Sequence, residues 1–270
     1  MHTTIPFTKL SATGNDFILF DNHKNILVNE NPAFFQRICQ RRTGIGADGI
    51  LILNAGLQSD FAMTYFNSDG SLGEMCGNGA RASAHYAHHR GITASSHVIF
   101  DVLGVKYEAD VDDNKVQLAM PPPKEIKLSP RIFSEPLFYR DGYANVGVPH
   151  YVLFTDDVAA IDVNEIGRKY RYHEAMQPWG TNVNFVEKID DNTLKIRTYE
   201  RGVEEETQAC GTGTISSVIV AMKHHMAVSP VHVHAPGGTL IVECDDEFRT
   251  IYLSGQVEMI YDGELYLQED

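Results

Sequence analysis

Short apolar runs that end at Asn, Asp, Gly or Pro recur along the chain and predict a strand-rich protein. The expected strands of the first half are Phe17–Asp21, Ile50–Leu53, Phe61–Phe66, Val98–Val102 and Val116–Met120. Those of the second half are Tyr151–Phe154, Asn182–Glu187, Leu194–Tyr199, Val231–His234 and Thr239–Cys244. Helices are expected over about Pro32–Arg42, Ala80–Arg90 and Thr214–Lys223. The last is apolar on nearly all sides, as a helix enclosed by a sheet must be.

The pattern repeats after 134 residues without a gap. The aligned pairs are Phe17–Phe20 with Tyr151–Phe154, Gly46 with Gly180, Thr64-Tyr65 with Thr198-Tyr199, Cys76-Gly77 with Cys210-Gly211, Gly79 with Gly213, Ser83 with Ser217, Gly104 with Gly238, and Asp112 with Asp246. Chance matching of apolar strands is the alternative, but it does not explain the matched glycines or the two C-G-x-G segments. We interpret the chain as one fold written twice.

Three consecutive prolines, Pro121 to Pro123, form a stiff extended stretch between the two halves. The expected domains are therefore residues 1–121, which carry Cys76, and residues 122–270, which carry Cys210. The last strand is expected to pack back on the first domain.

Composition narrows the class of protein. The 270 residues are 43% hydrophobic and 21% charged, which is typical of a folded globular protein rather than a disordered one. The formal net charge of −14 disfavours a nucleic-acid partner. No stretch approaches the roughly 20 apolar residues of a membrane helix, and the first residues lack a signal-peptide pattern. We expect a cytoplasmic protein that does not bind membranes.

The four cysteines are too few and too scattered for a disulfide framework. Two of them, Cys76 and Cys210, precede a Gly-x-Gly segment and an expected helix. The unpaired amides and the positive dipole end of a helix start can hold an anion, and a thiol placed there ionises more easily. Cys39 and Cys244 lack this context and are interpreted as structural cysteines.

Two such helix starts suggest a reaction. If the two halves pack about a pseudo-twofold axis, Cys76 and Cys210 face one space, and a substrate α-carbon can lie between their sulfurs. One thiolate then removes a proton while one thiol delivers a proton to the opposite side, which is racemisation without a cofactor. Two close thiols titrate as a coupled pair. The alternative is that both are buried structural cysteines.

At these residues the sequence resembles the diaminopimelate epimerase family. The matching stretches are T-G-N-D-F (Thr13 to Phe17), G-I-G-A-D-G (Gly44 to Gly49), D-G-S-x-x-E-M-C-G-N-G-A-R (Asp69 to Arg81), P-H (Pro149 and His150), N-V-N-F (Asn182 to Phe185), Y-E-R-G (Tyr199 to Gly202) and E-T-x-A-C-G-T-G (Glu206 to Gly213). They follow the family's order over nearly the whole chain. With the apolar pattern, the resemblance implies an α+β fold of two pseudo-symmetric domains, each a mixed or antiparallel barrel-like sheet wrapped around a central helix.

The resemblance also implies an activity and a set of site residues. The activity is the interconversion of LL- and meso-2,6-diaminopimelate, a step toward lysine and peptidoglycan precursors, with no metal or other cofactor. Cys76 and Cys210 are then the base and acid pair, Glu200 receives the reacting ammonium, and His150 assists the proton transfers. The substrate-binding residues implied are Asn15, Asn67, Gly77, Asn78, Asn182, Glu200, Arg201, Gly211 and Thr212.

Within that set, the amides of Gly77, Asn78, Gly211 and Thr212 are expected to hold the carboxylate at the reacting centre. The planar guanidinium of Arg201 suits the carboxylate at the far end of the substrate.

Other interpretations stay open at this point. A racemase of another amino acid, such as histidine or proline, would keep both Cys-Gly-x-Gly segments. A metal-binding or thiol-redox protein would use the clustered histidines, which are His85, His88, His89, His232 and His234. The phosphate-binding pattern G-x-x-x-x-G-K-S/T is absent. The sequence does not fix the oligomeric state, for which we consider a homodimer.

Overall fold

The computed structural model describes residues 4–27, 31–129 and 137–267. The chain divides into two compact units, unit 1 with Met1–Leu118 and Gly255–Asp270, and unit 2 with Ala119–Ser254. The division therefore lies close to the proline stretch at residues 121–123, and the C-terminal residues belong with the first half of the chain. In the part of the chain that the structure describes, none of the helices has both the length and the apolar character needed to cross a membrane.

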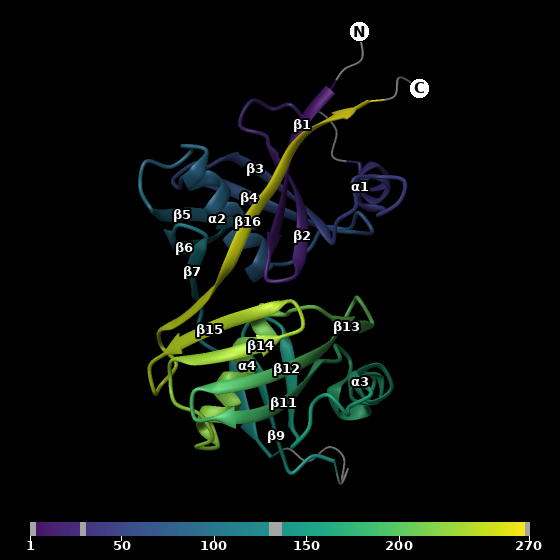
Figure 1. The fold of residues 1–270 in the computed structure, drawn as a ribbon, viewed down its shortest axis with the longest axis vertical. Helices are drawn as coiled ribbons and strands as arrows, with labels where there is room; N and C mark the ends of the chain where they lie inside the picture. Colours follow the sequence, from purple (N-terminus) through teal and green to yellow (C-terminus); the bar gives the residue numbers. More distant parts are fainter. Residues whose placement is uncertain (1–3, 28–30, 130–136, 268–270) are drawn as a thin grey trace. The chain divides into compact units, whose positions relative to one another are not determined.

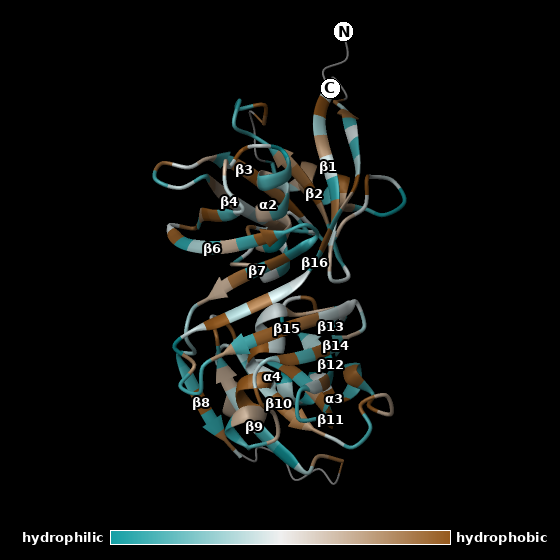
Figure 2. Cartoon of the chain, turned by 60° about the vertical axis from the view of Figure 1, so that its left-hand side comes forward, coloured by the Kyte–Doolittle hydropathy of each residue, from teal (hydrophilic) through white to brown (hydrophobic). Residues whose placement is uncertain are grey.

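Unit 1 is a closed sheet around a helix. Its strands are β1 (Thr4–Ala12), β2 (Asn15–Asp21), β3 (Gly49–Ala55), β4 (Phe61–Asn67), β5 (His97–Val102), β6 (Val105–Asp112), β7 (Lys115–Met120) and the C-terminal part of β16 (Ile251–Tyr266). They follow the order β1-β2-β3-β4-β5-β6-β7-β16, and β16 also pairs with β1, so these eight described strands close into a ring. Along β6 and β16, hydrophobic and hydrophilic residues alternate, which places one face of each strand inward (Figure 2).

Unit 2 also contains a sheet with a helix at its centre. Its strands are β8 (Glu125–Leu128), β9 (Arg140–Asn145), β10 (Pro149–Phe154), β11 (Asn182–Asp190), β12 (Thr193–Glu200), β13 (Glu205–Thr207), β14 (Val231–Ala235) and β15 (Gly238–Cys244). Their order is β15-β14-β12-β11-β10-β9-β8, and β13 pairs with β12 outside that order. A one-turn 3-10 helix, η1, covers Glu174–Met176.

Strand register confirms the internal duplication. The parallel pair β2–β3 places Phe17 opposite Gly49, and the parallel pair β10–β11 places Tyr151 opposite Val183, which are the positions 134 residues later. The pairs β4–β5 and β12–β14 correspond in the same way. The expectation of an α+β fold with two pseudo-symmetric domains, each a sheet wrapped around a central helix, is confirmed.

The two central helices are α2 (Gly77–His89) in unit 1 and α4 (Gly211–Lys223) in unit 2. Figure 1 shows each of them enclosed by the strands of its own unit. Every residue of α2 from Gly77 to Ala87 is buried, and its small residues let strands approach on all sides. The expected starts at Ala80 and Thr214 were three residues late, because the cysteine before each glycine segment takes the N-cap position and the glycines form the first turn.

The outer helices are α1 (Pro32–Cys39) and α3 (Val163–Arg171). Helix α1 begins at the N-cap Asn31, whose side chain accepts a hydrogen bond from the Ala33 amide. The expected helix end at Arg42 was wrong, because Gln40 has extended backbone and the following loop folds back, with the Gly46 amide bonded to the Ile38 carbonyl.

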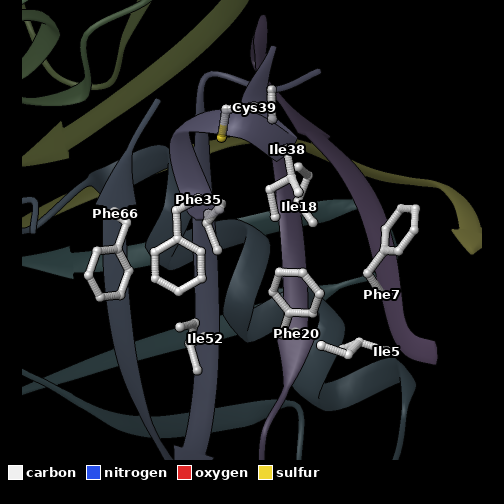
Figure 3. Close-up of a cluster of buried hydrophobic side chains, with 11 residues drawn as sticks. Ile5, Phe7, Ile18, Phe20, Phe35, Ile38, Cys39, Ile52 and Phe66 are labelled. Carbon is white, nitrogen blue, oxygen red and sulfur yellow. The ribbon is translucent and has the colours of Figure 1, made fainter. Parts of the chain in front are cut away.

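The apolar side of α1 covers the sheet of unit 1. Its Phe35 ring is fully buried and lies 4.6 Å from the Phe66 ring of β4, centroid to centroid. Figure 3 shows these two rings beside Ile52 and Phe20, which come from β3 and β2. The cluster thus ties the outer helix to three neighbouring strands.

Replacing Phe35 with alanine should destabilise unit 1 strongly. Removal of a fully buried aromatic side chain typically costs about 3–5 kcal/mol of unfolding free energy. Urea unfolding of Phe35→Ala against the unchanged protein measures the loss. The matched control is Gln36→Ala at the next, exposed position, which should change the unfolding free energy by no more than about 0.5 kcal/mol. Equal effects of the two substitutions would contradict the packing described.

Candidate active site

Cys76 lies at the start of the central helix of unit 1. It is the N-cap of α2, and its sulfur accepts a hydrogen bond from the Gly79 amide at 3.4 Å. The first intrahelical bond runs from the Ala80 amide to the Cys76 carbonyl, so the amides of Gly77 and Asn78 precede the regular helix bonds. The helix start therefore offers amide donors beside a half-buried thiol.

A polar network holds the residues around this helix start. The Asn78 side-chain amide donates to Asn15 Oδ1 at 2.5 Å, and Arg81 Nη2 donates to Asn78 Oδ1 at 2.8 Å. The same Arg81 nitrogen donates to Thr13 Oγ1 at 3.0 Å, in the turn between β1 and β2. Two of the expected substrate-binding residues, Asn15 and Asn78, are thus brought together with Cys76.

The network extends to charged residues on β1, on β2 and in the loop between α1 and β3. Asn15 Nδ2 donates to Asp48 Oδ2 at 3.1 Å, and Arg41 Nη2 bonds Asp48 at 2.6 Å and Asp16 at 2.7 Å. Lys9 bonds Asp16 at 2.6 Å. Burial raises the pKa of Asp16, but the hydrogen bonds from Arg41 and Lys9 outweigh it and bring the pKa to about 2. Asp16 is therefore ionised at neutral pH, and the network fixes the start of β2, where Asn15 lies.

Cys210 occupies the matching place in unit 2. It is the N-cap of α4 and is buried. Its sulfur lies 3.5 Å from Thr212 Oγ1, and that hydroxyl lies 2.9 Å from His150 Nε2. His150 Nδ1 lies 2.8 Å from Asn184 Oδ1. A continuous chain of polar contacts thus connects the thiol to a histidine on β10.

His150 is completely buried and neutral. Burial lowers its pKa to about 4, with a smaller contribution from the charge of Arg201, while the Asn184 hydrogen bond acts in the opposite direction. With Asn184 oriented as in the structure, its oxygen only accepts, so His150 carries its proton on Nδ1. Nε2 then accepts, and the Thr212 hydroxyl donates to it.

Gly213 is required at its position because Asn184 approaches the helix closely. A Cβ at residue 213 would lie 2.4 Å from Asn184 Nδ2 and 3.2 Å from His150 Cε1. The third residue after the cysteine therefore has to be glycine for the Asn184–His150 contact to form in unit 2.

The remaining expected residues of unit 2 lie at the ends of β11 and β12. The Asn182 side chain accepts from the Arg201 backbone amide at 2.6 Å and contacts His150 Nε2 at 3.3 Å. Glu200 accepts from the Thr207 hydroxyl at 2.9 Å. The Arg201 guanidinium donates to the Trp179 carbonyl at 3.0 Å, so its position is fixed by the loop before β11.

The structure thus forms two groups of expected site residues, one in each unit. Unit 1 holds Asn15, Asn78, Gly77 and Cys76 together, and Asn67 ends β4, opposite Gly49 on β3. Unit 2 holds His150, Asn182, Glu200, Arg201, Cys210, Gly211 and Thr212.

Sequence reasoning assigned no role to several residues of these networks. They are Thr13, Asp48, Arg81, Asn184 and Thr207. All five lie within the sequence stretches that match the diaminopimelate epimerase family, and this position is the signal that could have found them.

The clustered histidines do not form a metal site. Among residues 4–27, 31–129 and 137–267, no group of three or more His, Cys, Asp or Glu side chains is arranged to hold a metal ion. His88 and His89 each contact a backbone carbonyl through Nδ1. His85 Nε2 lies 3.4 Å from Asn114 Oδ1, and the His85 ring lies 4.1 Å from the His89 ring, centroid to centroid.

Comparisons with known proteins agree with this architecture. The profile of the family described as diaminopimelate epimerase matches residues 7–126 and 142–260. A diaminopimelate epimerase of Aquifex aeolicus is 38% identical over 274 residues, covering 96% of this chain and 97% of the relative. One of Methanocella arvoryzae is also 38% identical, over 275 residues and 97% of each chain. A crystal structure of a Bacillus anthracis phenazine biosynthesis protein of the PhzF family superposes with a TM-score of 0.75 at 15% identity, over 98% of this chain and 100% of that one.

These relatives, together with a duplicated fold that has a cysteine at each central helix start, define an epimerase, which is an isomerase. More narrowly, the chain belongs to the diaminopimelate epimerase family.

The protonation of His150 can be checked by NMR. We expect its imidazole to remain neutral down to about pH 5, with the proton on Nδ1, because burial lowers its pKa to about 4. Long-range proton–nitrogen spectra recorded from pH 8 to pH 4.5 report both the charge and the tautomer, and His150→Gln assigns the signal. Titration of the His150 signal near pH 6.5, the ordinary value, would contradict the buried neutral ring.

Proposed function

We propose that this protein interconverts LL- and meso-2,6-diaminopimelate by a two-base reaction that uses Cys76 and Cys210 and no cofactor. The observation that carries the proposal is the duplicated helix start, where a cysteine caps a buried, glycine-rich helix in each unit. Membership of the family supports the substrate. The proposal requires the two sulfurs to approach one α-carbon from opposite sides.

The carboxylate next to the reacting carbon needs hydrogen-bond donors that keep their own protons during the reaction. The amides of Gly77, Asn78, Gly211 and Thr212 precede the regular bonds of their helices and meet this need. As negative charge develops on the α-carbon and its carboxylate, fixed amide dipoles in a water-poor site stabilise it more than water does. These amides thus act both in binding and in the transition state.

The chemical step conserves protons. One cysteine begins as thiolate, takes the α-proton and becomes a thiol, while the electrons of the C–H bond remain on the substrate. The other cysteine begins as thiol, gives its proton to the opposite side of the carbon and becomes a thiolate. The stereocentre is inverted and the pair has exchanged protonation states, so the reverse reaction uses the same groups.

The other residues bind and orient the substrate in this proposal. Glu200 pairs with the ammonium at the reacting carbon, and Arg201 with the carboxylate at the distal end, with Asn15, Asn67 and Asn182 orienting the distal amino acid. His150 is neutral, so it orients Thr212 by accepting a hydrogen bond from its hydroxyl and does not donate a proton to the substrate.

Alanine at either Cys76 or Cys210 should abolish epimerisation. Each variant keeps one thiol and can exchange a proton on one side only, so conversion of LL- to meso-diaminopimelate, followed by chiral chromatography, should fall at least about a thousandfold. Cys39→Ala and Cys244→Ala are matched controls and should retain most activity. The proposal fails if either Cys76→Ala or Cys210→Ala epimerises at the rate of the controls.

Replacing Arg201 with lysine tests the distal carboxylate. Lysine keeps the positive charge but loses the planar pair of donors, so kcat/KM for LL-diaminopimelate should fall by about tenfold or more. Arg168→Lys, on the outer helix α3, is the control. An unchanged kcat/KM would remove Arg201 from substrate binding and favour the alternative of a racemase for another amino acid, which activity toward histidine or proline would then reveal.

A further inference from the structure

The two helix starts differ in one buried residue. Position 81, on the first turns of α2, is arginine, and the matching position 215 on α4 is isoleucine. Both side chains are completely buried. At equivalent positions of the two helices, a buried cation therefore follows Cys76 and a buried apolar side chain follows Cys210.

Arg81 is an unusual cation because it is enclosed without a carboxylate. Its Nη2 donates to Asn78 and Thr13, which are neutral. Its Nε and Nη1 are buried and have no hydrogen-bond partner within the described residues. A charge buried in this way is costly unless an opposite charge compensates it, so the site points to an anion that is not part of the hydrogen-bond network.

Cys76 is the group that can supply this charge. Burial lowers the pKa of Arg81 to about 10, and the Cys76 thiolate is the one ionisable group in the described chain whose charge raises it. The attraction is mutual, so the guanidinium favours the thiolate form of Cys76 to the same extent. The Gly79 amide, which donates to the Cys76 sulfur, acts in the same direction.

The charged groups in the network around Asn15 are paired with one another. Asp16 on β2 is paired with Lys9 of β1 and with Arg41. Asp48, on the loop before β3, is also paired with Arg41. On α2 itself, burial lowers the pKa of His85, so this ring adds no positive charge at neutral pH.

The Thr212 contact of Cys210 favours the opposite protonation state. Because the Thr212 hydroxyl donates to His150 Nε2, its oxygen is left as an acceptor toward the Cys210 sulfur. A sulfur that faces an acceptor keeps its proton. The matching position to Arg81 is apolar, so no cation opposes this in the first turns of α4.

We propose that Arg81 is a positioning residue that holds Cys76 as the thiolate in the resting enzyme, while the Thr212–His150 contact holds Cys210 as the thiol. This inference rests on the proposed two-cysteine function and assigns the starting role of each cysteine. The stereoisomer that presents its α-hydrogen to Cys76 can be deprotonated directly by the resting enzyme. The other stereoisomer requires a proton to move from Cys210 to Cys76 first.

The experiment measures the ionisation of each thiol directly, without substrate. The full-length variants Cys210→Ala and Cys76→Ala each leave one of the two cysteines and remove the coupling between them. Both are alkylated with iodoacetamide between pH 5 and pH 10, and the modified residue is identified by mass spectrometry. We expect the rate at Cys76 to reach half its maximum at least about one pH unit below that at Cys210.

Removal of the guanidinium should erase this difference. In Cys210→Ala, adding Arg81→Met should raise the half-maximum for Cys76 and slow its alkylation at neutral pH about tenfold. Arg81→Lys should restore most of the rate. Arg90→Met, which removes another positive charge from the end of α2, is the control and should change nothing. In Cys76→Ala, Arg81→Met should leave Cys210 unaffected.

An unchanged Cys76 half-maximum in Arg81→Met, or a half-maximum for Cys76 above that for Cys210, would overturn the proposal. Circular dichroism checks that each variant folds. If Arg81→Met does not fold, Arg81→Gln replaces it. The order of the two half-maxima in the proteins that keep Arg81 then also tests the proposal. Failure of the two-cysteine function would appear separately, as epimerisation that survives the loss of Cys76 or Cys210.

Discussion

A helix that starts inside a protein exposes amide N–H groups that the helix itself cannot satisfy, and this constraint shapes both halves of the molecule. In each unit the central helix is enclosed by strands and begins at a cysteine followed by Gly-x-Gly. Water cannot easily accept hydrogen bonds from these buried amides, so the helix starts are suited to bind an anionic ligand group. The surrounding sheet, the small residues of the helices and the polar networks all maintain that place.

The duplication is faithful in backbone and different in side chains. Corresponding parallel strand pairs have the same register, so the cysteines occupy equivalent positions. Around them, one unit supplies Asn15, Asn78 and Arg81, whereas the other supplies His150, Asn184 and Thr212. A symmetric fold thereby gives two thiols different surroundings, which a reaction that needs one base and one acid can use.

The sequence predicted the repeat, the central helices and the motif residues, because glycines and cysteines recur at the same spacing in the two halves of the chain. It did not predict β1, β6, β8, β9 or the length of β16, because polar residues interrupt the apolar runs from which the strands were expected. The roles of Arg81 and Asn184 were also out of reach. Their contacts with Thr13 and His150 join residues 68 and 34 positions apart in the sequence, and only the register of the folded strands brings them together.

The central claim is that two thiols act on opposite sides of one carbon, and solvent deuterium tests it most directly. LL-diaminopimelate is incubated with the protein in deuterated water with a chelator, and early samples are analysed by mass spectrometry. The account predicts that the meso product carries deuterium at the inverted α-carbon from the first turnovers, while the remaining LL substrate stays nearly unlabelled. A product that retains the original hydrogen, or substrate labelled as fast as product forms, would indicate a single base and contradict the account.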